Sequence, residues 1–405
     1  MRQNTEKLFS TATTRACAQK LLAHARSGAS RHWRVNDSQL AATAERVAQV
    51  TRERYPTLEI PYHSRWRHFE SHSADGLLDR RAWLGSAAQD ARCLIDLVVV
   101  SVLLDAGAGP AWHYKEARTG LVLSRSEGLG VASFHAFGDG LFSSDPTQPL
   151  RCDALGLQRL TPANLAQAMQ VSDSNPLVGL EGRTQLLRRL GKAMAEQPEV
   201  FGTDGRPGAL FDAAQREAQQ AGSAVSAELL LRLLLRTLSR IWPSGSQLGG
   251  TAVGDCWPHS ALGTPDTAQG WIPFHKLSQW LTYSLLEPFA WAGVPVQGLG
   301  ALTGLPEYRN GGLFIDAGVL ELMDAKAATH PWQASDELIV EWRALTVALL
   351  DELAPLVRQH LGKTEADMPL ACILEGGTWA TGRVLAQTLR DGKPPLNIAS
   401  DGTIF

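Results

Sequence analysis

A carboxylate, a phenol and a guanidinium stand side by side in TGLPEYRNGG (303–312), where Glu307, Tyr308 and Arg309 follow one another. Glycine and proline interrupt regular structure, so we expect the three side chains to be held on a short loop or at the start of a helix. A carboxylate fixed beside a cation and an aromatic ring can stabilise a sugar-like cation or orient a water molecule. The decapeptide alone favours a simpler interpretation, a capped turn with a surface ion pair.

Three further segments place a carboxylate or an imidazole next to a large aromatic ring: GAGPAWHYKE (107–116), GDCWPHS (254–260) and LEGGTWATGR (374–383). Their candidate residues are Trp112, His113, Asp255, Trp257, His259, Glu375 and Trp379. Loose surface loops seldom contain so many large aromatics. A cleft for a flat or sugar-like ligand does, because aromatic faces supply contact area and polar groups fix orientation. The four segments therefore predict one aromatic-walled ligand site.

Carboxylates near aromatic rings are suited to glycosyl chemistry. Cleavage of a C–N bond at an anomeric carbon develops an oxocarbenium-like cation, which a carboxylate can stabilise while a second acid assists the departing group. Arg183, Lys276 and Arg309 could hold a phosphate, and Arg183 also lies in the first turn of a predicted helix, where backbone amides favour anions. Each basic residue, taken alone, is more often part of a solvated helix face.

Metal and cysteine chemistry remain open as alternatives. Asp255, Cys256, His259 and His275 have side chains that can bind a metal ion, but their spacing matches no zinc motif. Cys256 could act as a nucleophile only with a base and an oxyanion hole that the sequence does not reveal. The chain contains no phosphate-binding GxxxxGK[ST] loop. We therefore expect no metal and no organic cofactor.

Composition is that of a large globular protein. The 405 residues carry a formal charge of −3 and are 44% hydrophobic, which indicates neither nucleic acid nor an anionic membrane as a partner. Five scattered cysteines without a CxxC pair favour a reducing compartment, and we expect a cytoplasmic location. The first 34 residues resemble an organellar transit peptide in composition, but an ordinary N-terminal helix or extension is favoured. The oligomeric state stays open, and a monomer is compatible with the sequence.

Helical periodicity dominates the chain. Apolar residues spaced three and four apart predict helices over 336–361, 224–242, 274–287, 38–54, 180–196 and 377–390. The apolar run 93–109 fits either a buried strand or a buried helix, and 114–125 reads as a small β-hairpin. Glycine, serine and proline predict long loops over 125–180. We expect one mostly helical domain over 1–405.

The segments together resemble a known family, the uracil-catabolism proteins of fungi and bacteria, long known only as a domain of unknown function. The resemblance covers nearly the whole chain and rests on these segments: RWRHFE (65–70), LIDLVVVSVLLDAGAGPAWHYKE (94–116), DSNPLVGLEGR (173–183), GDCWPH (254–259), PFHKLSQWLTYSLLEP (273–288), LTGLPEYRNGG (302–312), LEGGTWATGR (374–383) and the terminal SDGTIF (400–405). It implies a role in pyrimidine degradation and leaves the chemical step open.

A more distant similarity, to the queuosine-nucleotide N-glycosidases of queuine salvage, rests on motif order. GDCW, LTGLPEYRNGG, ELIVEWRALTVALLDEL and LEGGTWATGR follow one another as corresponding motifs do in that family. The similarity implies a helical fold like that of DNA glycosylases and hydrolysis of a ribose–base bond. The family's aspartates fall on Glu307, on Asp255 and on or near Glu375. Glutamate replaces aspartate at two of these places, so the substrate need not be a base nucleotide.

The resemblances imply hydrolysis of a ribosyl C–N bond, with ribosylurea or its 5-phosphate as the small-molecule substrate. Glu307 would stabilise the cation and position water, with Asp255 and Glu375 completing the catalytic set. The remaining substrate-binding candidates are Tyr308, Arg309, Trp112, His113, Trp257, His259, Lys276, Arg183, Trp379 and Asp96. Two other functions remain possible, a metal-dependent amidohydrolase that attacks the ureido carbonyl and a non-catalytic protein that binds a uracil metabolite.

Overall fold

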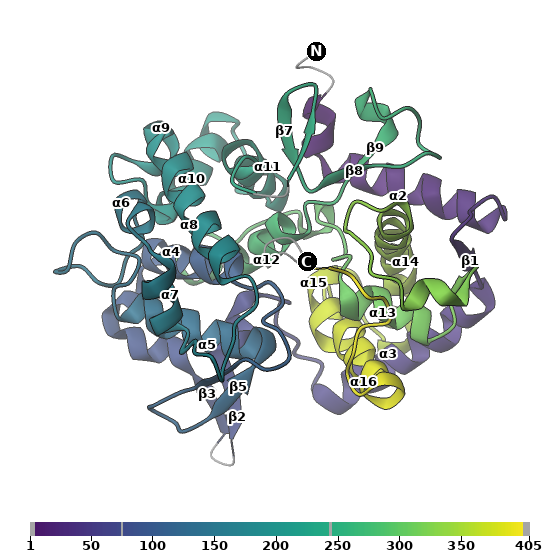
Figure 1. Ribbon diagram of the computed structural model, residues 1–405, viewed down its shortest axis with the longest axis horizontal. Coiled ribbons are helices and arrows are strands. Elements are labelled where there is room, and N and C mark those ends of the chain that lie inside the picture. Colours follow the sequence, from purple (N-terminus) through teal and green to yellow (C-terminus); the bar gives the residue numbers. More distant parts are fainter. Residues whose placement is uncertain (1–4, 74–75, 243–244, 400–405) are drawn as a thin grey trace. The chain divides into compact units, whose positions relative to one another are not determined.

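Helices make up most of the chain in the computed structural model, which describes residues 5–73, 76–242 and 245–399 (Figure 1). The chain divides into two compact units built from interleaved segments. Unit 1 comprises residues 1–63, 246–279 and 298–399, and unit 2 comprises 64–245, 280–297 and 400–405. The mainly helical class predicted from the sequence is confirmed, whereas the single domain stays a prediction.

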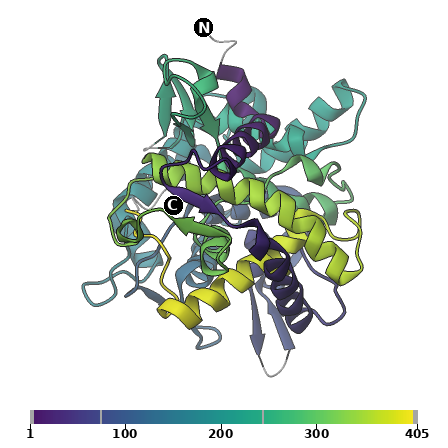
Figure 2. The same ribbon diagram turned by 90° about the vertical axis from the view of Figure 1, so that its right-hand side faces the viewer.

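Unit 1 is organised around the long helix α14 (Glu337–Leu361). Its apolar stripe packs against α2 (Thr11–Arg26) and α3 (Leu40–Arg54). Figure 2 shows α14 in yellow-green beside α2 in dark purple. The helix ends at Gly362, whose φ of 66° suits glycine. Helix α13 (Tyr308–Asp316) packs against α14 and α16 (Trp379–Arg390). Basic residues of the N-terminal helix hold it in place, since Arg15 pairs with Asp351 on α14.

The remaining elements of unit 1 are short. Its other helical segments are η1 (Glu6–Phe9), η2 (Asp37–Gln39), η6 (Ala268–Gly270), η7 (Leu299–Ala301), η8 (Ala325–Ala328), α15 (Leu370–Ile373) and the π-helical η9 (Leu374–Thr378). Its strands form three antiparallel pairs: β1 (Trp33–Val35) with β10 (Leu320–Leu322), β6 (Ser246–Leu248) with β7 (Thr251–Gly254), and β8 (Cys256–Pro258) with β9 (Trp271–Pro273). In the first pair, Trp33 lies opposite Leu322 and Val35 lies opposite Leu320.

Unit 2 contains the most apolar helix, α4 (Ala91–Leu103), in which every residue except Arg92 is buried. A helix buried on all sides lacks an amphipathic stripe, which is why its sequence fits a strand equally well. The other helical segments of unit 2 are η3 (Arg65–Phe69), η4 (Arg80–Gln89), α5 (Arg125–Gly138), α6 (Ala154–Gln158), α7 (Pro162–Ala168), α8 (Leu180–Ala195), α9 (Pro198–Phe201), η5 (Pro207–Ala209), α10 (Leu210–Gln220) and α11 (Ala227–Leu238). Helix α12 (Lys276–Trp291) contributes residues to both units.

Two hairpins belong to unit 2, β2 (Glu70–Ser73) with β3 (Gly76–Asp79) and β4 (His113–Lys115) with β5 (Val122–Ser124). The second confirms the hairpin predicted over 114–125. The described residues form five two-stranded sheets in all, where the sequence predicts a single hairpin. Short, irregular strands such as β8 carry too few residues for a clear alternating pattern.

The long loops predicted over 125–180 are only partly confirmed: residues 139–153 and 169–179 lie outside helices and strands, but α5 occupies 125–138, and α6 and α7 occupy most of 154–168. The glycines that suggested loops serve close packing instead. A Cβ at Gly128 would lie 2.8 Å from the carbonyl oxygen of Leu123, and one at Gly130 would lie 2.7 Å from the Cβ of His68. Glycine here lets neighbouring segments touch the α5 backbone, so its presence does not mark a turn.

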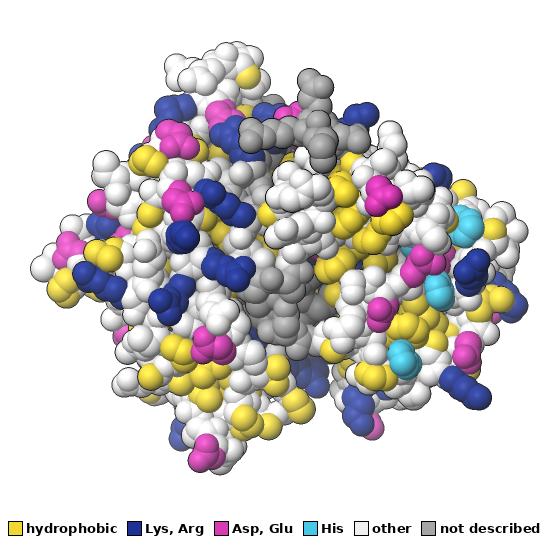
Figure 3. All heavy atoms as spheres, turned by 45° about the horizontal axis from the view of Figure 1, so that its top comes forward, with side chains coloured by type: hydrophobic (Ala, Val, Ile, Leu, Met, Phe, Trp, Pro, Cys, Tyr) yellow, Lys and Arg dark blue, Asp and Glu magenta, His cyan; other side chains and the backbone are white. Residues whose placement is uncertain are grey.

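The surface view in Figure 3 shows Lys and Arg side chains and acidic ones distributed among hydrophobic and uncharged groups. None of the helices in the described residues is long and apolar enough to cross a membrane.

Candidate active site

Glu307 lies at the N-terminus of α13, as the sequence predicts for a helix start. Its side chain caps the helix: the backbone N–H of Arg309 donates to Oε2 at 2.7 Å and that of Asn310 donates to Oε1 at 2.6 Å. The side chain is only partly buried. Helix N-termini favour negative charge, so this position holds an oriented, accessible carboxylate. The capped turn and the catalytic interpretation are therefore compatible.

Glu375 lies in the π-helical turn η9 and is 6% exposed. His63 Nδ1 lies 2.9 Å from Oε2, while Arg54 Nη2 and the Tyr55 hydroxyl each approach Oε1 at 3.2 Å. Arg54 also donates to the carbonyl oxygen of Glu375. π-Helical turns occur frequently at functional sites. This one presents a buried carboxylate to an imidazole, a guanidinium and a phenol.

The wide turn of η9 accommodates a neighbouring helix. A Cβ at Gly377 would lie 2.5 Å from both Thr51 Oγ1 and Val47 Cγ1 on α3. Only a residue without a side chain allows α3 to come this close. The Glu-Gly-Gly sequence therefore brings the end of α3, with Arg54 and Tyr55, beside the Glu375 carboxylate.

Asp255, the third predicted acid, is fully engaged by hydrogen bonds. Arg343 on α14 donates to both oxygens at 2.7 Å, Trp257 Nε1 donates to Oδ1 at 2.8 Å, and the backbone N–H of Lys276 donates to Oδ2 at 3.0 Å. A carboxylate offers about four acceptor positions, and these four bonds use them. Burial would raise the pKa of Asp255, but the charge and hydrogen bonds of Arg343 lower it to about 2. Asp255 is therefore a fixed anion.

Helix α13 connects the elements that carry the three acids. Asn310, in its first turn, is buried and accepts a hydrogen bond from Thr378 Oγ1 of η9 at 2.8 Å. One residue further, the carbonyl oxygen of Gly311 accepts from Trp342 Nε1 at 3.2 Å, and Trp342 precedes the arginine that binds Asp255. The three acids thus belong to one unit and to elements that α13 joins, while their direct convergence stays a prediction.

Besides Trp257, five further candidates lie in the same unit, and one of them, His259, is 4% exposed. The Tyr308 hydroxyl donates to the Ile398 carbonyl oxygen at 3.4 Å, and burial raises the pKa of this phenol to about 12. Arg309 Nη1 donates to the carbonyl oxygen of Gly392 at 3.3 Å. The centre of the Trp379 ring lies 6.1 Å from that of the His63 ring. The backbone N–H of Lys276 donates to Asp255, and the residue is partly exposed.

Two candidates in unit 2, Trp112 and Arg183, are buried by structural contacts. Trp112 Nε1 donates to the Met169 carbonyl oxygen at 3.0 Å. Arg183 was expected to meet phosphate, but its guanidinium donates to the carbonyls of Leu104, Ala106 and Gly107, just after α4. Burial lowers the pKa of Arg183 to about 10. These bonds satisfy the carbonyl groups of the segment that follows α4, which gives Arg183 a structural task.

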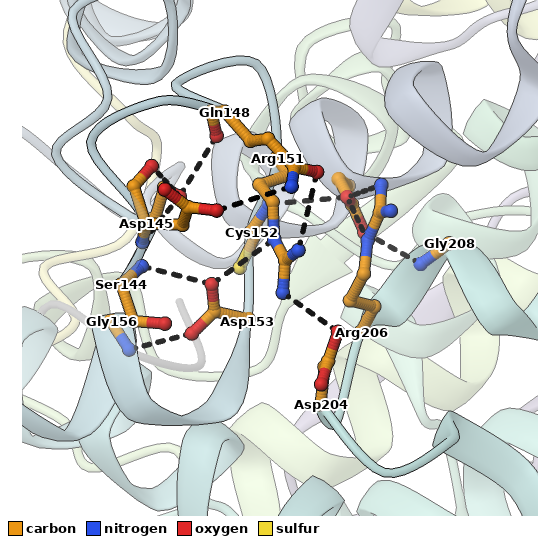
Figure 4. A network of polar contacts seen from close by, with 12 residues as sticks. Ser144, Asp145, Gln148, Arg151, Cys152, Asp153, Gly156, Asp204, Arg206 and Gly208 are labelled. Carbon is orange, nitrogen blue, oxygen red and sulfur yellow. Dashed lines mark hydrogen bonds and ion pairs between the residues drawn. The ribbon is translucent and has the colours of Figure 1, made fainter.

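The other two unit 2 candidates differ in exposure. His113 is exposed on β4. Asp96 is completely buried in α4, where it accepts from Arg206 and from the backbone N–H of Gly208 at 2.7 Å. Burial raises the pKa of Asp96 to about 6, although Arg206 acts against the rise. Figure 4 shows Arg206 and Gly208 within a polar network that continues through Arg151. A ligand role for either candidate stays a prediction.

The cysteine considered as a nucleophile is buried between backbone groups. Cys256 Sγ donates to the Val253 carbonyl oxygen at 3.0 Å and lies 3.6 Å from His275 Nε2, which itself donates to the Leu8 carbonyl oxygen at 2.7 Å. Burial raises the pKa of Cys256 well above its ordinary value and lowers that of His275. Both changes disfavour a thiolate–imidazolium pair. Within the described residues, no three His, Cys, Asp or Glu side chains gather as metal ligands do.

Sequence reasoning missed several residues of the site: Arg54, Tyr55, His63, Asn310, Arg343 and Glu341, whose Oε2 lies 3.7 Å from His259 Nε2. Two of them had a usable signal. Glu341 and Arg343 are the charged residues within the mostly apolar stretch 338–350 of α14, and such positions usually mark buried ion pairs or functional groups. The partners of Glu375 had none, because Arg54 and His63 lie more than three hundred residues away in the chain.

Comparison with known proteins agrees with the resemblance stated above. A family described as "Protein of unknown function (DUF1688)" matches residues 7–405. Protein urg3 of Schizosaccharomyces pombe (strain 972 / ATCC 24843) is 40% identical, with 98% of each chain covered. Uracil catabolism protein 4 of Lachancea kluyveri is 36% identical, with 93% of each chain covered. On this evidence the chain belongs to the DUF1688 family, together with these two fungal proteins.

Proposed function

We propose that this protein acts in uracil catabolism and hydrolyses a ribosyl C–N bond, with ribosylurea or its 5-phosphate as substrate. The pathway is supported by the name of the Lachancea kluyveri relative, which is similar over 93% of both chains. The reaction is supported by the carboxylates of unit 1 and by the motif order shared with ribosyl-hydrolysing enzymes. The observation that carries the proposal is the oriented, partly exposed carboxylate of Glu307.

In the proposed reaction the bond between C1′ and the ureido nitrogen breaks, and water adds to C1′. The transition state carries positive charge on the ring oxygen and C1′. Glu307 stabilises that charge and accepts a proton from the attacking water. Its two bonds to the α13 backbone leave about two acceptor positions for these tasks. The products are urea and ribose, or ribose 5-phosphate.

The departing nitrogen needs a proton, and we assign this step to the pair of Glu375 and His63. Their contact of 2.9 Å lets the carboxylate orient the imidazole, which gives its proton to the departing nitrogen. Asp255 has another task in this scheme. All its acceptor positions are used within the protein, so it positions Arg343 and the strand β8 without touching the sugar.

The test is urea release from synthetic ribosylurea and its 5-phosphate by purified protein. Glu307→Gln keeps an acceptor for the helix cap but removes the charge, and we expect the rate to fall about 100-fold or more. Glu321→Gln is the matched control, because it makes the same change at an exposed residue of the same unit. Urea release at the wild-type rate by Glu307→Gln would refute the assignment.

The product pattern separates the alternatives. An amidohydrolase would attack the ureido carbonyl and release a ribosylamine, ammonia and carbon dioxide, with no urea. A non-catalytic binding protein would show ligand-dependent thermal stabilisation but no product after prolonged incubation. Either result from the wild-type protein would overturn the proposed reaction.

A further inference from the structure

Two buried polar side chains of unit 1 lie next to each other without hydrogen bonds between them. His259 is 4% exposed and Glu341, on α14, is 1% exposed. His259 Nε2 lies 3.7 Å from Glu341 Oε2, which is too long for a hydrogen bond. His259 Nε2 and Glu341 Oε1 are both buried and lack any hydrogen-bond partner. A donor without a partner and an acceptor without a partner therefore lie on two neighbouring side chains.

The hydrogen bonds around His259 indicate which of its nitrogens carries the proton. Nδ1 accepts from the backbone N–H of Ala261 at 3.1 Å, so in the neutral ring Nε2 is the donor. One turn earlier on α14, Glu337 is held by the backbone N–H and the hydroxyl of Ser260, both at 3.0 Å. Glu337 thus has the partners that Glu341 lacks, although both acids project toward the segment that follows β8.

A buried carboxylate oxygen without a hydrogen-bond partner is costly, and native structures rarely contain one. One member of the pair, His259, directly follows the strand β8, which forms part of the candidate site. Asp255 and His259 flank β8 on either side, and with Trp257 they occupy alternate positions, which in an extended chain point to the same side. The bonds of Asp255 to Trp257 and Arg343 show that this side faces α14. The unmet groups therefore adjoin the Asp255 anchor.

We propose that His259 and Glu341 bind the ureido group of the substrate. A ureide offers a carbonyl oxygen beside an N–H, and these match the imidazole N–H donor and the carboxylate acceptor. Ribose, with hydroxyl groups alone, lacks this planar edge. The inference rests on the proposed function, which it deepens by assigning recognition of the leaving group to a pair distinct from Glu307 and Glu375.

The experiment measures binding, so that it does not depend on turnover. Affinities for ribosylurea 5-phosphate and ribose 5-phosphate are determined by calorimetry with Glu307→Gln protein, which holds the ligand without rapid hydrolysis. Glu341→Gln is added to this background, and Glu337→Gln serves as the matched control on the same helix. We expect the preference for the ureido compound to fall about 10- to 100-fold in the first and to persist in the second.

Thermal unfolding distinguishes a binding role from a structural one. Glu341→Gln changes a carboxylate whose Oε1 has no hydrogen-bond partner in the protein, so its melting temperature should equal or exceed that of the parent. Glu337→Gln weakens two bonds to Ser260 and should lower it slightly. A lower melting temperature for Glu341→Gln with an unchanged ureido preference would show a structural pair and overturn the proposal. Should Glu341→Gln fail to fold, Glu341→Asp, one methylene shorter, replaces it.

Failure of the site and failure of the proposed reaction give different results. If the parent binds ribosylurea 5-phosphate no more tightly than ribose 5-phosphate, the ureido site is refuted even when wild-type protein releases urea. If the preference exists and depends on Glu341 but wild-type protein releases no urea, the site stands and the proposed hydrolysis fails. If Glu341→Gln changes neither the preference for ribosylurea 5-phosphate nor the melting temperature, only water occupies the space beside His259 and Glu341. This result also refutes the ureido site.

Discussion

The hydrogen bond between Thr378 and Asn310 joins the turn that carries Glu375 to the helix that Glu307 caps. Both residues are completely buried, and the donor–acceptor distance is 2.8 Å. Thr378→Val removes the hydroxyl and keeps the shape of the side chain. Asn310 Oδ1 would then remain buried without its partner, which costs about 1–3 kcal/mol. The link between the two catalytic segments would also loosen.

Thr381 provides a matched control three residues away. It is equally buried, but its hydroxyl has no hydrogen-bond partner. Thr381→Val therefore removes an unmet polar group, and we expect it to be neutral or stabilising. The difference between the two valine variants isolates the bond to Asn310, because both variants make the same chemical change.

Stability is measured by unfolding in guanidinium chloride, since urea is the expected product and would compete for the site. We expect Thr378→Val to unfold at lower denaturant concentration than Thr381→Val and to release urea more slowly, with Thr381→Val close to wild type. Equal stability and equal activity of the two variants would refute the idea that this bond connects η9 to α13. Thr378→Ser, which retains the hydroxyl, should recover most of the lost activity.

Three further outcomes are expected. Asp255→Asn leaves the buried Arg343 without its anion and should cost about 3–5 kcal/mol, measured by thermal unfolding at pH 7. The pKa of Asp255 is lowered to about 2, so the carboxylate stabilises the fold fully above its ordinary pKa near 4, and this stabilisation is lost as pH falls toward 2. The melting temperatures of wild type and Asp255→Asn should therefore converge in acid. A difference that stays constant with pH would contradict this. Gly382→Ala would place a Cβ 2.1 Å from the Arg309 carbonyl oxygen and push α16 away from α13, so it should destabilise the protein by about 1–3 kcal/mol. Gly138→Ala is the control, because its Cβ would meet nothing within 4 Å and should leave the stability unchanged.

Amphipathic helices were the most predictable part of the fold. The pattern over 336–361 corresponds to α14, and the patterns over 38–54 and 180–196 correspond to α3 and α8, because each helix buries one face. The helix predicted over 274–287 continues through Pro288 to Trp291 as α12. A proline removes one backbone donor but does not end a helix that is held by its neighbours.

The site was only partly predictable, because sequence indicates residue types and not their partners. The helix-capping position of Glu307 follows from local turn chemistry and was expected. The Arg343 bond that fixes Asp255 joins residues 88 positions apart, so it depends on the packing of α14 against β8. For Arg183, local sequence predicted the wrong partner. Its position in the first turn of a helix suggested that it binds an anion, but its guanidinium donates to backbone carbonyl groups at and after the end of α4.

The antiparallel pairing of β1 with β10 has a consequence for biosynthesis. Trp33, almost completely buried in the finished protein, pairs opposite Leu322, which the ribosome adds roughly 15 to 60 s later at ordinary elongation rates. Throughout that interval the nascent N-terminal segment exposes an indole and an open strand edge, the kind of surface that chaperones recognise. Slowed translation before residue 320 should therefore lengthen the period in which this chain is prone to aggregate.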